Sequence, residues 1–197
     1  MDFTKGLYLR NYLHSSTFNI KSNEKGLLDE KVSAYVGFDP TAQNLHLGNY
    51  LQLITIFRAV EYGIDPILVL GRATGGIGDP SGKSKERVML SQEDISNNSN
   101  LIREKLIALA DNIKSFLHNK KGLSADYTII DNYDFYKEMC VLDFFREFGF
   151  NIRINPLLNR EAISKRLESE EGMTYTEFSY QLFQSIDYYY LNKDYVI

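Results

Sequence analysis

Y-V-G-F-D-P-T-A-Q-N-L-H-L-G-N, residues Tyr35 to Asn49, begins as a strand, breaks at Asp39-Pro40 and continues as a helix near Leu45. The first N–H groups of a helix have no partner within the helix, and the helix dipole adds positive potential, so this corner suits an anion. Its polar side chains and its glycines, which let a ligand approach the backbone, are Asp39, Thr41, His46, Asn49, Gly37 and Gly48. An ordinary strand-to-helix turn that stops at a proline explains the same spacing without a ligand.

Segments on either side of this corner alternate between strand and helix patterns. We expect strands where β-branched and apolar residues run together, at Val32–Phe38, Pro66–Leu70 and Tyr127–Ile130. We expect helices where apolar residues recur every three or four positions, at Lys5–Leu13, Leu45–Tyr62, Ser91–Leu117, Lys137–Phe148, Asn159–Leu167 and Thr174–Leu191. This order predicts an α/β fold with a parallel, doubly wound sheet. Ligands of such sheets bind at the carboxyl ends of the strands.

Length and composition limit the class of protein. With 197 residues, 44% of them apolar, the chain forms about one to one and a half domains with a real core. A net charge of −4 gives no overall basic character, so nucleic-acid contacts would need a local patch or another segment. The single cysteine, Cys140, excludes an internal disulfide and a cysteine-based metal cluster. His14, His46 and His118 lack metal-ligand spacing, so we predict no protein-bound metal.

The sequence also bears on the compartment. No run approaches the roughly 18 consecutive apolar residues of a membrane span, so we expect none. The amino terminus has neither a secretory apolar core nor an Arg- and Ser-rich organellar leader. We therefore expect a cytoplasmic protein, with the mitochondrial matrix or another organelle as the alternative.

Glycines and charges fill the segment Gly71–Lys85, G-R-A-T-G-G-I-G-D-P-S-G-K-S-K. It is not the P-loop of a kinase or NTPase, because Ile77 stands where that pattern needs glycine and Pro80 removes an N–H donor. A long glycine-rich loop that continues into Lys83 and Arg87 favours a mobile substrate loop over a stiff phosphate cradle. An exposed basic loop without a ligand is the alternative.

The last expected helix carries a polar stripe. Thr174 and Glu177 have the spacing of a capping box at its start. Tyr180, Gln184 and Asp187 follow at i, i+4 and i+7, so a phenol, an amide and a carboxylate share one narrow face. An amphipathic helix with a solvated polar side explains that pattern without any ligand.

Three stretches, in this order, resemble tyrosyl-tRNA synthetases, which are class I aminoacyl-tRNA synthetases. They are Y-V-G-F-D-P-T-A-Q-N-L-H-L-G-N, then G-x-A-T-G-x-I-G-D-P-S-G-K-x-x-E-R, then T-E-F-S-Y-Q-L-F-Q-S-I-D-Y-Y-Y-L. The resemblance spans nearly the whole chain from Gly26. Within the family, the sequence is similar to the bacterial and mitochondrial branch. It implies a Rossmann-like catalytic domain over residues 31–197, which follows an N-terminal helix and polar connection over residues 1–30.

The resemblance implies that L-tyrosine reacts with ATP to give tyrosyl-adenylate, and that the tyrosyl group then passes to tRNA(Tyr). Magnesium would arrive with ATP. The implied contacts to tyrosine are Tyr35, Asp79, Tyr180, Gln184 and Asp187. The implied contacts to ATP are Gly37, Asp39, Thr41, His46, Gly48 and Asn49, and the implied catalytic groups are Thr41, His46, Asn49, Lys83 and Arg87.

Two positions depart from the family pattern. Asn49 stands at the second histidine of the His-Ile-Gly-His signature, and its neutral amide still hydrogen-bonds a ribose but never becomes cationic. Arg72 replaces a glycine of the usual Gly-Gly-Ala-Thr run, which bears on the packing of the backbone near the pocket.

The resemblance also bears on completeness and partners. The Gly-Gly-Ser-Asp-Gln stretch, the Lys-rich loop and the tRNA-binding domains that it implies do not occur in these 197 residues. We therefore expect an N-terminal fragment that does not aminoacylate by itself, and detectable charging of tRNA by this chain would contradict that. A homodimer through helices at about residues 135–170 is implied as well. The competing interpretation is a non-catalytic binding or dimerisation module derived from the synthetase, and the gene sequence past Ile197 separates the two.

Overall fold

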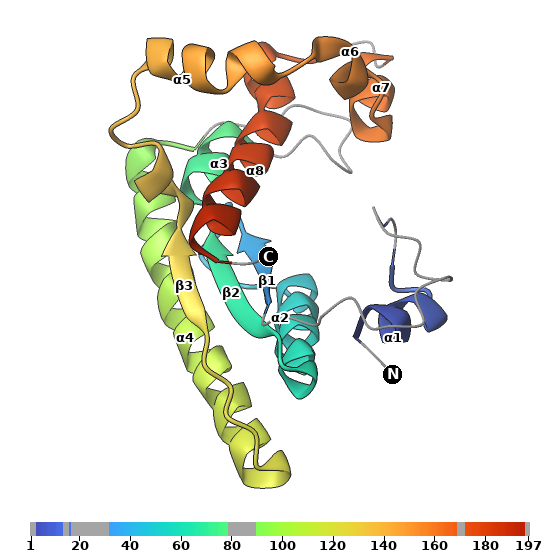
Figure 1. The fold of residues 1–197 in the computed structure, drawn as a ribbon. Helices are drawn as coiled ribbons and strands as arrows, with labels where there is room; N and C mark the ends of the chain where they lie inside the picture. Colours follow the sequence, from blue (N-terminus) through green and yellow to red (C-terminus); the bar gives the residue numbers. More distant parts are fainter. Residues whose placement is uncertain (1–2, 14–15, 17–31, 79–89, 169–171, 196–197) are drawn as a thin grey trace.

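A three-stranded parallel sheet forms the centre of the computed structural model, which describes residues 3–13, 16, 32–78, 90–168 and 172–195. The strands are β1 (Ser33–Phe38), β2 (Asp65–Leu70) and β3 (Thr128–Asp131), in the order β1-β2-β3. Phe38 pairs with Leu70, and Leu70 pairs with Asp131, so the three strands end at one edge of the sheet. The predicted parallel α/β sheet is therefore confirmed (Figure 1).

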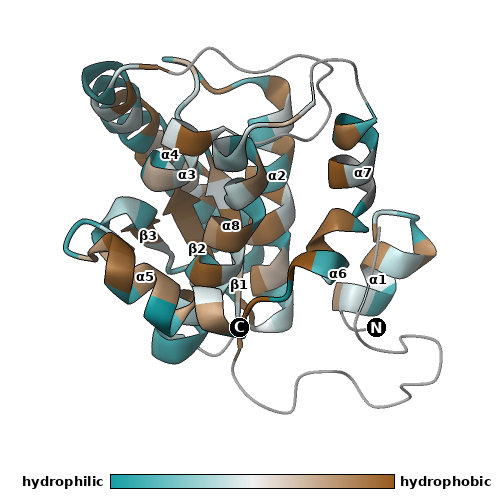
Figure 2. Ribbon diagram, turned by 90° about the horizontal axis from the view of Figure 1, so that it is seen from above, coloured by the Kyte–Doolittle hydropathy of each residue, from teal (hydrophilic) through white to brown (hydrophobic). Residues whose placement is uncertain are grey.

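Helices cover both faces of this sheet because the side chains of β2 alternate between the faces. Leu68 and Leu70 pack with α2 (Leu47–Ala59) and α4 (Gln92–Lys121). Ile67 and Val69 pack with α8 (Tyr175–Asp194). The continuous apolar sequence of β2 follows from this burial on two sides, and Figure 2 shows the hydrophobic strand in the middle of the molecule.

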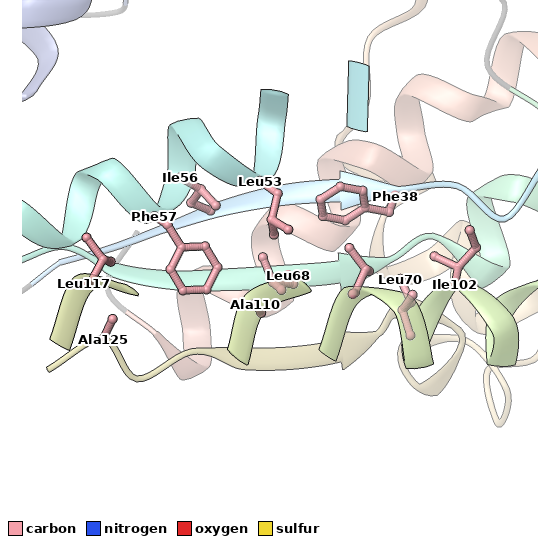
Figure 3. Packing of buried hydrophobic residues seen from close by; sticks show 11 residues of the cluster. Phe38, Leu53, Ile56, Phe57, Leu68, Leu70, Ile102, Ala110, Leu117 and Ala125 are labelled. Atoms are coloured by element: carbon pink, nitrogen blue, oxygen red, sulfur yellow. The ribbon is translucent and has the colours of Figure 1, made fainter. Parts of the chain in front are cut away.

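The larger core lies between the sheet and the pair α2 and α4. Phe57 and Leu53 of α2 point toward Leu68 of β2 and Ala110 of α4 (Figure 3). The Leu53 and Phe57 side chains are each 1% exposed or less, and the burial of each contributes roughly 1.5–3 kcal/mol to the stability of the fold. This core fixes the position of α2, and so of the corner that precedes it.

The remaining helices are short. They are α1 (Phe3–Leu9), η1 (Val60–Tyr62), α3 (Arg72–Ile77), η2 (Asn132–Phe135), α5 (Val141–Glu147), η3 (Gly149–Asn151), α6 (Ile154–Leu158) and α7 (Glu161–Leu167). The expected polar connection before residue 31 lies outside the described residues, so the domain boundary there stays a prediction.

Two expected helices of the C-terminal half have different limits. The helix expected at Lys137–Phe148 begins only at Val141, because the Cys140 thiol accepts from the Asp143 N–H and caps α5 there. The helix expected at Asn159–Leu167 is two helices, since Asn159 ends α6 and α7 starts after Arg160.

The expected glycine-rich loop after β2 is wrong in its first half. Residues Arg72–Ile77 form the helix α3, in which the N–H of Gly75 donates to the carbonyl of Gly71. A Cβ on Gly75 would lie 2.8 Å from the Pro40 ring, so close packing of α3 on the β1 corner requires glycine there. Tertiary contact therefore stabilises a helix that its glycines disfavour.

At the start of α8, one of the two hydrogen bonds of the expected capping box is present. The Thr174 hydroxyl accepts from the Glu177 N–H at 3.2 Å, as its spacing predicts. The Glu177 carboxylate does not return to the cap, because it accepts from the Arg166 Nε at 3.0 Å. Both side chains of this pair are nearly buried, so the pair joins α7 to α8.

Candidate functional site

A carboxylate at the end of β1 connects three elements at the carboxyl edge of the sheet. Asp39 Oδ1 accepts from the Thr74 hydroxyl of α3 at 2.7 Å. Asp39 Oδ2 accepts from the Tyr180 hydroxyl of α8 at 3.0 Å. A Cβ on Gly71 would lie only 2.6 Å from Thr74 Oγ1, so glycine at this position leaves room for the contact.

Asn132 continues this network at the end of β3. Its side chain is fully buried, at 0% exposure. Oδ1 accepts from the Ala73 N–H at 2.8 Å, and Nδ2 donates to Thr74 Oγ1 at 3.2 Å and to Asp187 Oδ2 at 2.8 Å. One amide therefore fixes α3 and α8 to the strand end.

Asp187 is the buried carboxylate of this network. It is 6% exposed, and its Oδ1 accepts from the Tyr136 hydroxyl at 2.5 Å. Burial raises the pKa of Asp187 to about 6, against the lowering effect of the hydrogen bonds from Tyr136 and Asn132. The charge of Asp39 raises it further.

Tyr35 on β1 faces the same region. Burial raises the pKa of the Tyr35 phenol, and the charge of Asp187 raises it further. Its ring also lies 6.3 Å from the Tyr188 ring of α8. A phenol that donates beside a carboxylate that accepts is the pair needed to recognise a ligand hydroxyl, which both accepts and donates.

The strand-to-helix corner forms a second group of polar residues. The N–H of Asn49 donates to His46 Nδ1 at 3.2 Å, and Asn49 Oδ1 accepts from the His46 N–H at 3.1 Å, so the two cap α2 reciprocally. Because Nδ1 accepts, a neutral His46 carries its proton on Nε2 and donates from there. A Cβ on Gly48 would lie 3.0 Å from the His46 ring, which is a structural reason for glycine besides ligand approach.

Side chains of α4 hold this corner in place by hydrogen bonds. Asn98 Nδ2 donates to the Pro40 carbonyl at 3.1 Å, in a buried setting. The Lys105 ammonium donates to Asn44 Oδ1 at 2.6 Å and to the Gln43 carbonyl. Thr41, in the same corner, is exposed.

The structure joins some of the expected site residues and separates others. Asp39, Tyr180 and Asp187 belong to one hydrogen-bond network, and the charge of Asp187 acts on the Tyr35 phenol, whereas Gln184 lies exposed on α8. The corner residues that we expect at ATP are exposed or half-buried, namely Gly37, Thr41, His46, Gly48 and Asn49. Asp79, Lys83 and Arg87 lie outside the described residues.

Sequence reasoning missed three members of the network. Asn132 directly follows β3, and Thr74 lies in the first turn of the helix that follows β2, so the rule that ligands bind at the carboxyl ends of parallel strands could have found both. Tyr136 has no such signal, because it reaches Asp187 only through the turn after η2. Within the described residues, no three His, Cys, Asp or Glu side chains gather as a metal site.

Arg72, where the family pattern has glycine, turns away from the network. Its guanidinium lies 4.4 Å from the centroid of the Tyr133 ring and 3.9 Å from Asp131 Oδ2. Burial raises the pKa of Asp131, against the lowering effects of the hydrogen bond from the Tyr133 N–H and of the Arg72 charge. The arginine therefore connects the first turn of α3 to the β3 end without entering the polar network.

A parallel sheet with a polar network at its carboxyl edge is the architecture of nucleotide-dependent α/β enzymes. The family model for tRNA synthetases class I (W and Y) matches residues 28–197. The chain therefore belongs to this family of class I synthetases.

Individual relatives agree with this assignment. The chain is 41% identical over 191 residues to a tyrosine–tRNA ligase of Flavobacterium johnsoniae, covering 96% of the chain and 41% of the relative. It is 42% identical over 168 residues to a tyrosine–tRNA ligase of Mycoplasmopsis agalactiae, covering 85% of the chain and 36% of the relative. A C-terminally truncated mitochondrial tyrosyl-tRNA synthetase of Aspergillus nidulans superposes with a TM-score of 0.86 at 27% identity, over 98% of this chain and 54% of that one. The chain thus spans about two fifths of the length of these curated relatives.

Proposed function

We propose that this chain is the tyrosine-binding part of a tyrosine–tRNA ligase, which activates L-tyrosine with ATP and transfers it to tRNA(Tyr). The observation that carries the proposal is the buried Asp187 carboxylate, whose charge acts on the Tyr35 phenol of β1. A tyrosine substrate would donate its phenol O–H to Asp187 and accept from Tyr35. Phenylalanine would leave both protein groups unpaired, which is costly in a buried site.

The other end of the amino acid requires groups that bind an ammonium. Tyr180 is held by Asp39, and the two lie on the α8 side of the strand end. We assign the ammonium contacts to Tyr180, Gln184 and Asp79. Gln184 is exposed on α8, so its contact would form with the bound substrate.

ATP is assigned to the corner between β1 and α2. Asp39 and the open surface at Gly37 would face the adenosine, because a Cβ on Gly37 meets nothing within 4 Å. Thr41, His46 and Asn49 would donate to the phosphates or the ribose, and the Nε2 proton of His46 suits that role. As negative charge builds on the α-phosphate, such donors stabilise the transition state without transferring a proton. Magnesium belongs to the substrate ATP in this assignment.

The basic residues Lys83 and Arg87 would complete the phosphate contacts. They follow α3 in the sequence, and α3 itself packs through Gly75 on Pro40 of the corner. In-line transfer to a phosphorus centre depends mainly on such positioning and on cations.

A second copy of the chain is the proposed partner at about residues 135–170. Large apolar side chains are exposed along α5, η3 and α6, including Phe145 at 49%, Phe150 at 80% and Ile154 at 61%. Phe144 stacks on Phe183 of α8 with the ring centroids 5.5 Å apart, which is an ordinary spacing for an aromatic pair. A homodimer would bury these side chains next to α8, which carries the proposed tyrosine site.

We assign the protein to the cytoplasm, with the mitochondrial matrix or another organelle as the alternative. None of the helices that the structure describes is long and apolar enough to span a bilayer.

The competing function is a non-catalytic dimerisation module, which the exposed apolar side chains of α5 and α6 would also serve. Tyrosine-dependent exchange of pyrophosphate into ATP by the full-length gene product separates the two, because a module shows none.

Calorimetric titration with L-tyrosine tests the proposed site. Asp187→Ala should weaken tyrosine binding by about tenfold or more, since a hydrogen bond to a charged group contributes about 1.5–3 kcal/mol. Asp194→Ala removes an exposed carboxylate from the last turn of the same helix and should bind as the unchanged chain does. Equal affinity in the two variants would refute the assignment of Asp187.

A further inference from the structure

The carboxylate of the proposed tyrosine pocket is held by a tyrosine of the protein itself. The Tyr136 hydroxyl lies 2.5 Å from Asp187 Oδ1 and 3.0 Å from the Phe183 carbonyl. Its ring packs on the Phe183 ring, with the centroids 5.0 Å apart, and lies 6.3 Å from Phe135. Both the ring and the hydroxyl of Tyr136 are therefore fixed against α8.

Two donors act on Asp187 from one short segment. Tyr136 donates to Oδ1, and Asn132 donates to Oδ2 at 2.8 Å. An ionised carboxylate offers about four lone-pair positions, so each oxygen retains capacity for another donor. Because Asn132 opens η2 and Tyr136 directly follows it, this segment sets the plane of the carboxylate.

We propose that Tyr136 is a positioning residue for amino-acid recognition, whose hydroxyl orients the Asp187 carboxylate to accept the phenol O–H of tyrosine. The inference rests on the proposed function, because it assigns a role at the same pocket. Tyr136 does not touch the substrate in this arrangement. It acts through Asp187 alone.

The charges around Asp187 support this role. Burial and the charge of Asp39 raise the pKa of Asp187, while the hydrogen bonds from Tyr136 and Asn132 lower it. Tyr35 faces it from β1 as a neutral phenol, since its own pKa is raised. Loss of the Tyr136 hydroxyl removes one lowering effect, so a larger fraction of Asp187 is protonated near neutral pH. A protonated carboxyl presents an O–H donor of its own and suits the substrate phenol less well.

Tyr136→Phe tests the inference, because it removes the hydroxyl and retains the ring that packs on Phe183. Two quantities are measured across about pH 5 to pH 8, a range that brackets the Asp187 pKa of about 6. They are the ¹³C NMR titration of the Asp187 carboxyl carbon and the calorimetric affinity for L-tyrosine. We expect the carboxyl midpoint to rise and tyrosine affinity at neutral pH to fall about tenfold, with recovery as the pH increases. Tyr133→Phe, which removes an exposed phenol O–H three residues earlier, should leave both curves unchanged.

The outcomes separate the inference from the proposed function. If the unchanged chain binds no tyrosine, the proposed function is refuted, and the recognition role of Tyr136 with it. If the chain binds tyrosine but Tyr136→Phe leaves the carboxyl midpoint and the pH profile where they were, only the inference is overturned. A loss of affinity that is equal at every pH also overturns it, because packing alone would then explain the effect. Thermal unfolding of each variant confirms that the compared proteins are folded.

Discussion

Replacing Asn132 by alanine should destabilise the fold more than any exposed substitution, because this fully buried amide joins β3, α3 and α8. The variant loses a charge-assisted hydrogen bond to Asp187, which contributes about 1.5–3 kcal/mol. It also leaves the Ala73 N–H without its acceptor, at about 1–3 kcal/mol. Such contributions do not add fully within one network, so we expect a loss of about 3 kcal/mol in the free energy of unfolding.

Urea and thermal unfolding measure this loss. For a chain of 197 residues, about 3 kcal/mol corresponds to a fall in Tm of roughly 6–12 °C. Asn100→Ala is the matched control, because Asn100 is exposed within α4 and its loss should change the free energy by less than about 0.5 kcal/mol. Equal stability of the two variants would show that the Asn132 network does not hold the carboxyl edge together.

Three further perturbations test the packing and the electrostatics around the site. Gly71→Ala should lower the free energy of unfolding by about 1–3 kcal/mol, because the added Cβ would overlap the carboxylate at the end of β1. Gly37→Ala places its Cβ in open space and should leave the stability unchanged. Equal melting temperatures of the two variants would contradict this expectation. Arg166→Leu should lower the free energy of unfolding by about 3–5 kcal/mol, because it leaves the buried Glu177 carboxylate without its cation. The double variant that also carries Glu177→Leu should be more stable than Arg166→Leu alone. The reverse order in urea unfolding would be evidence against a tightly buried pair. The pKa of Asp187 in the folded state, about 6, lies above its ordinary value of 3.8, so the folded state binds this proton more tightly than the unfolded state does. The contribution of Asp187 to the free energy of unfolding therefore increases as the pH falls from about 7 to about 4, by up to ~3 kcal/mol. Asp187→Asn should lack this increase, and parallel stability curves for the two proteins over that range would refute the raised pKa.

The sheet could be predicted because its sequence signals are local. The apolar run of β2 reports burial on two faces, and Asp39-Pro40 marks the end of β1. The polar stripe of α8 was also visible, since Tyr180 and Asp187 are spaced for one helix face and both join the observed network.

The elements that escaped prediction depend on contacts between distant residues. The glycines of α3 disfavour a helix by about 1 kcal/mol each, and tertiary contacts such as the fit of Gly75 against Pro40 and the hydrogen bond from the Ala73 N–H to Asn132 offset this cost. The shorter limits of α5 follow from a thiol cap at Cys140, a residue with no strong capping preference. Asn132 and Tyr136 meet Asp187 across more than 50 positions of sequence, which no local pattern reports.

The most direct measurement of the central claim is a thermodynamic cycle between the substrate hydroxyl and Asp187. Calorimetry gives the affinities of L-tyrosine and L-phenylalanine for the unchanged chain and for Asp187→Ala. We expect a strong preference for tyrosine in the unchanged chain, of the kind for which tyrosine synthetases are the usual example, and a large loss of that preference in the variant. The same ratio of affinities in both proteins would contradict the claim that Asp187 recognises the phenol.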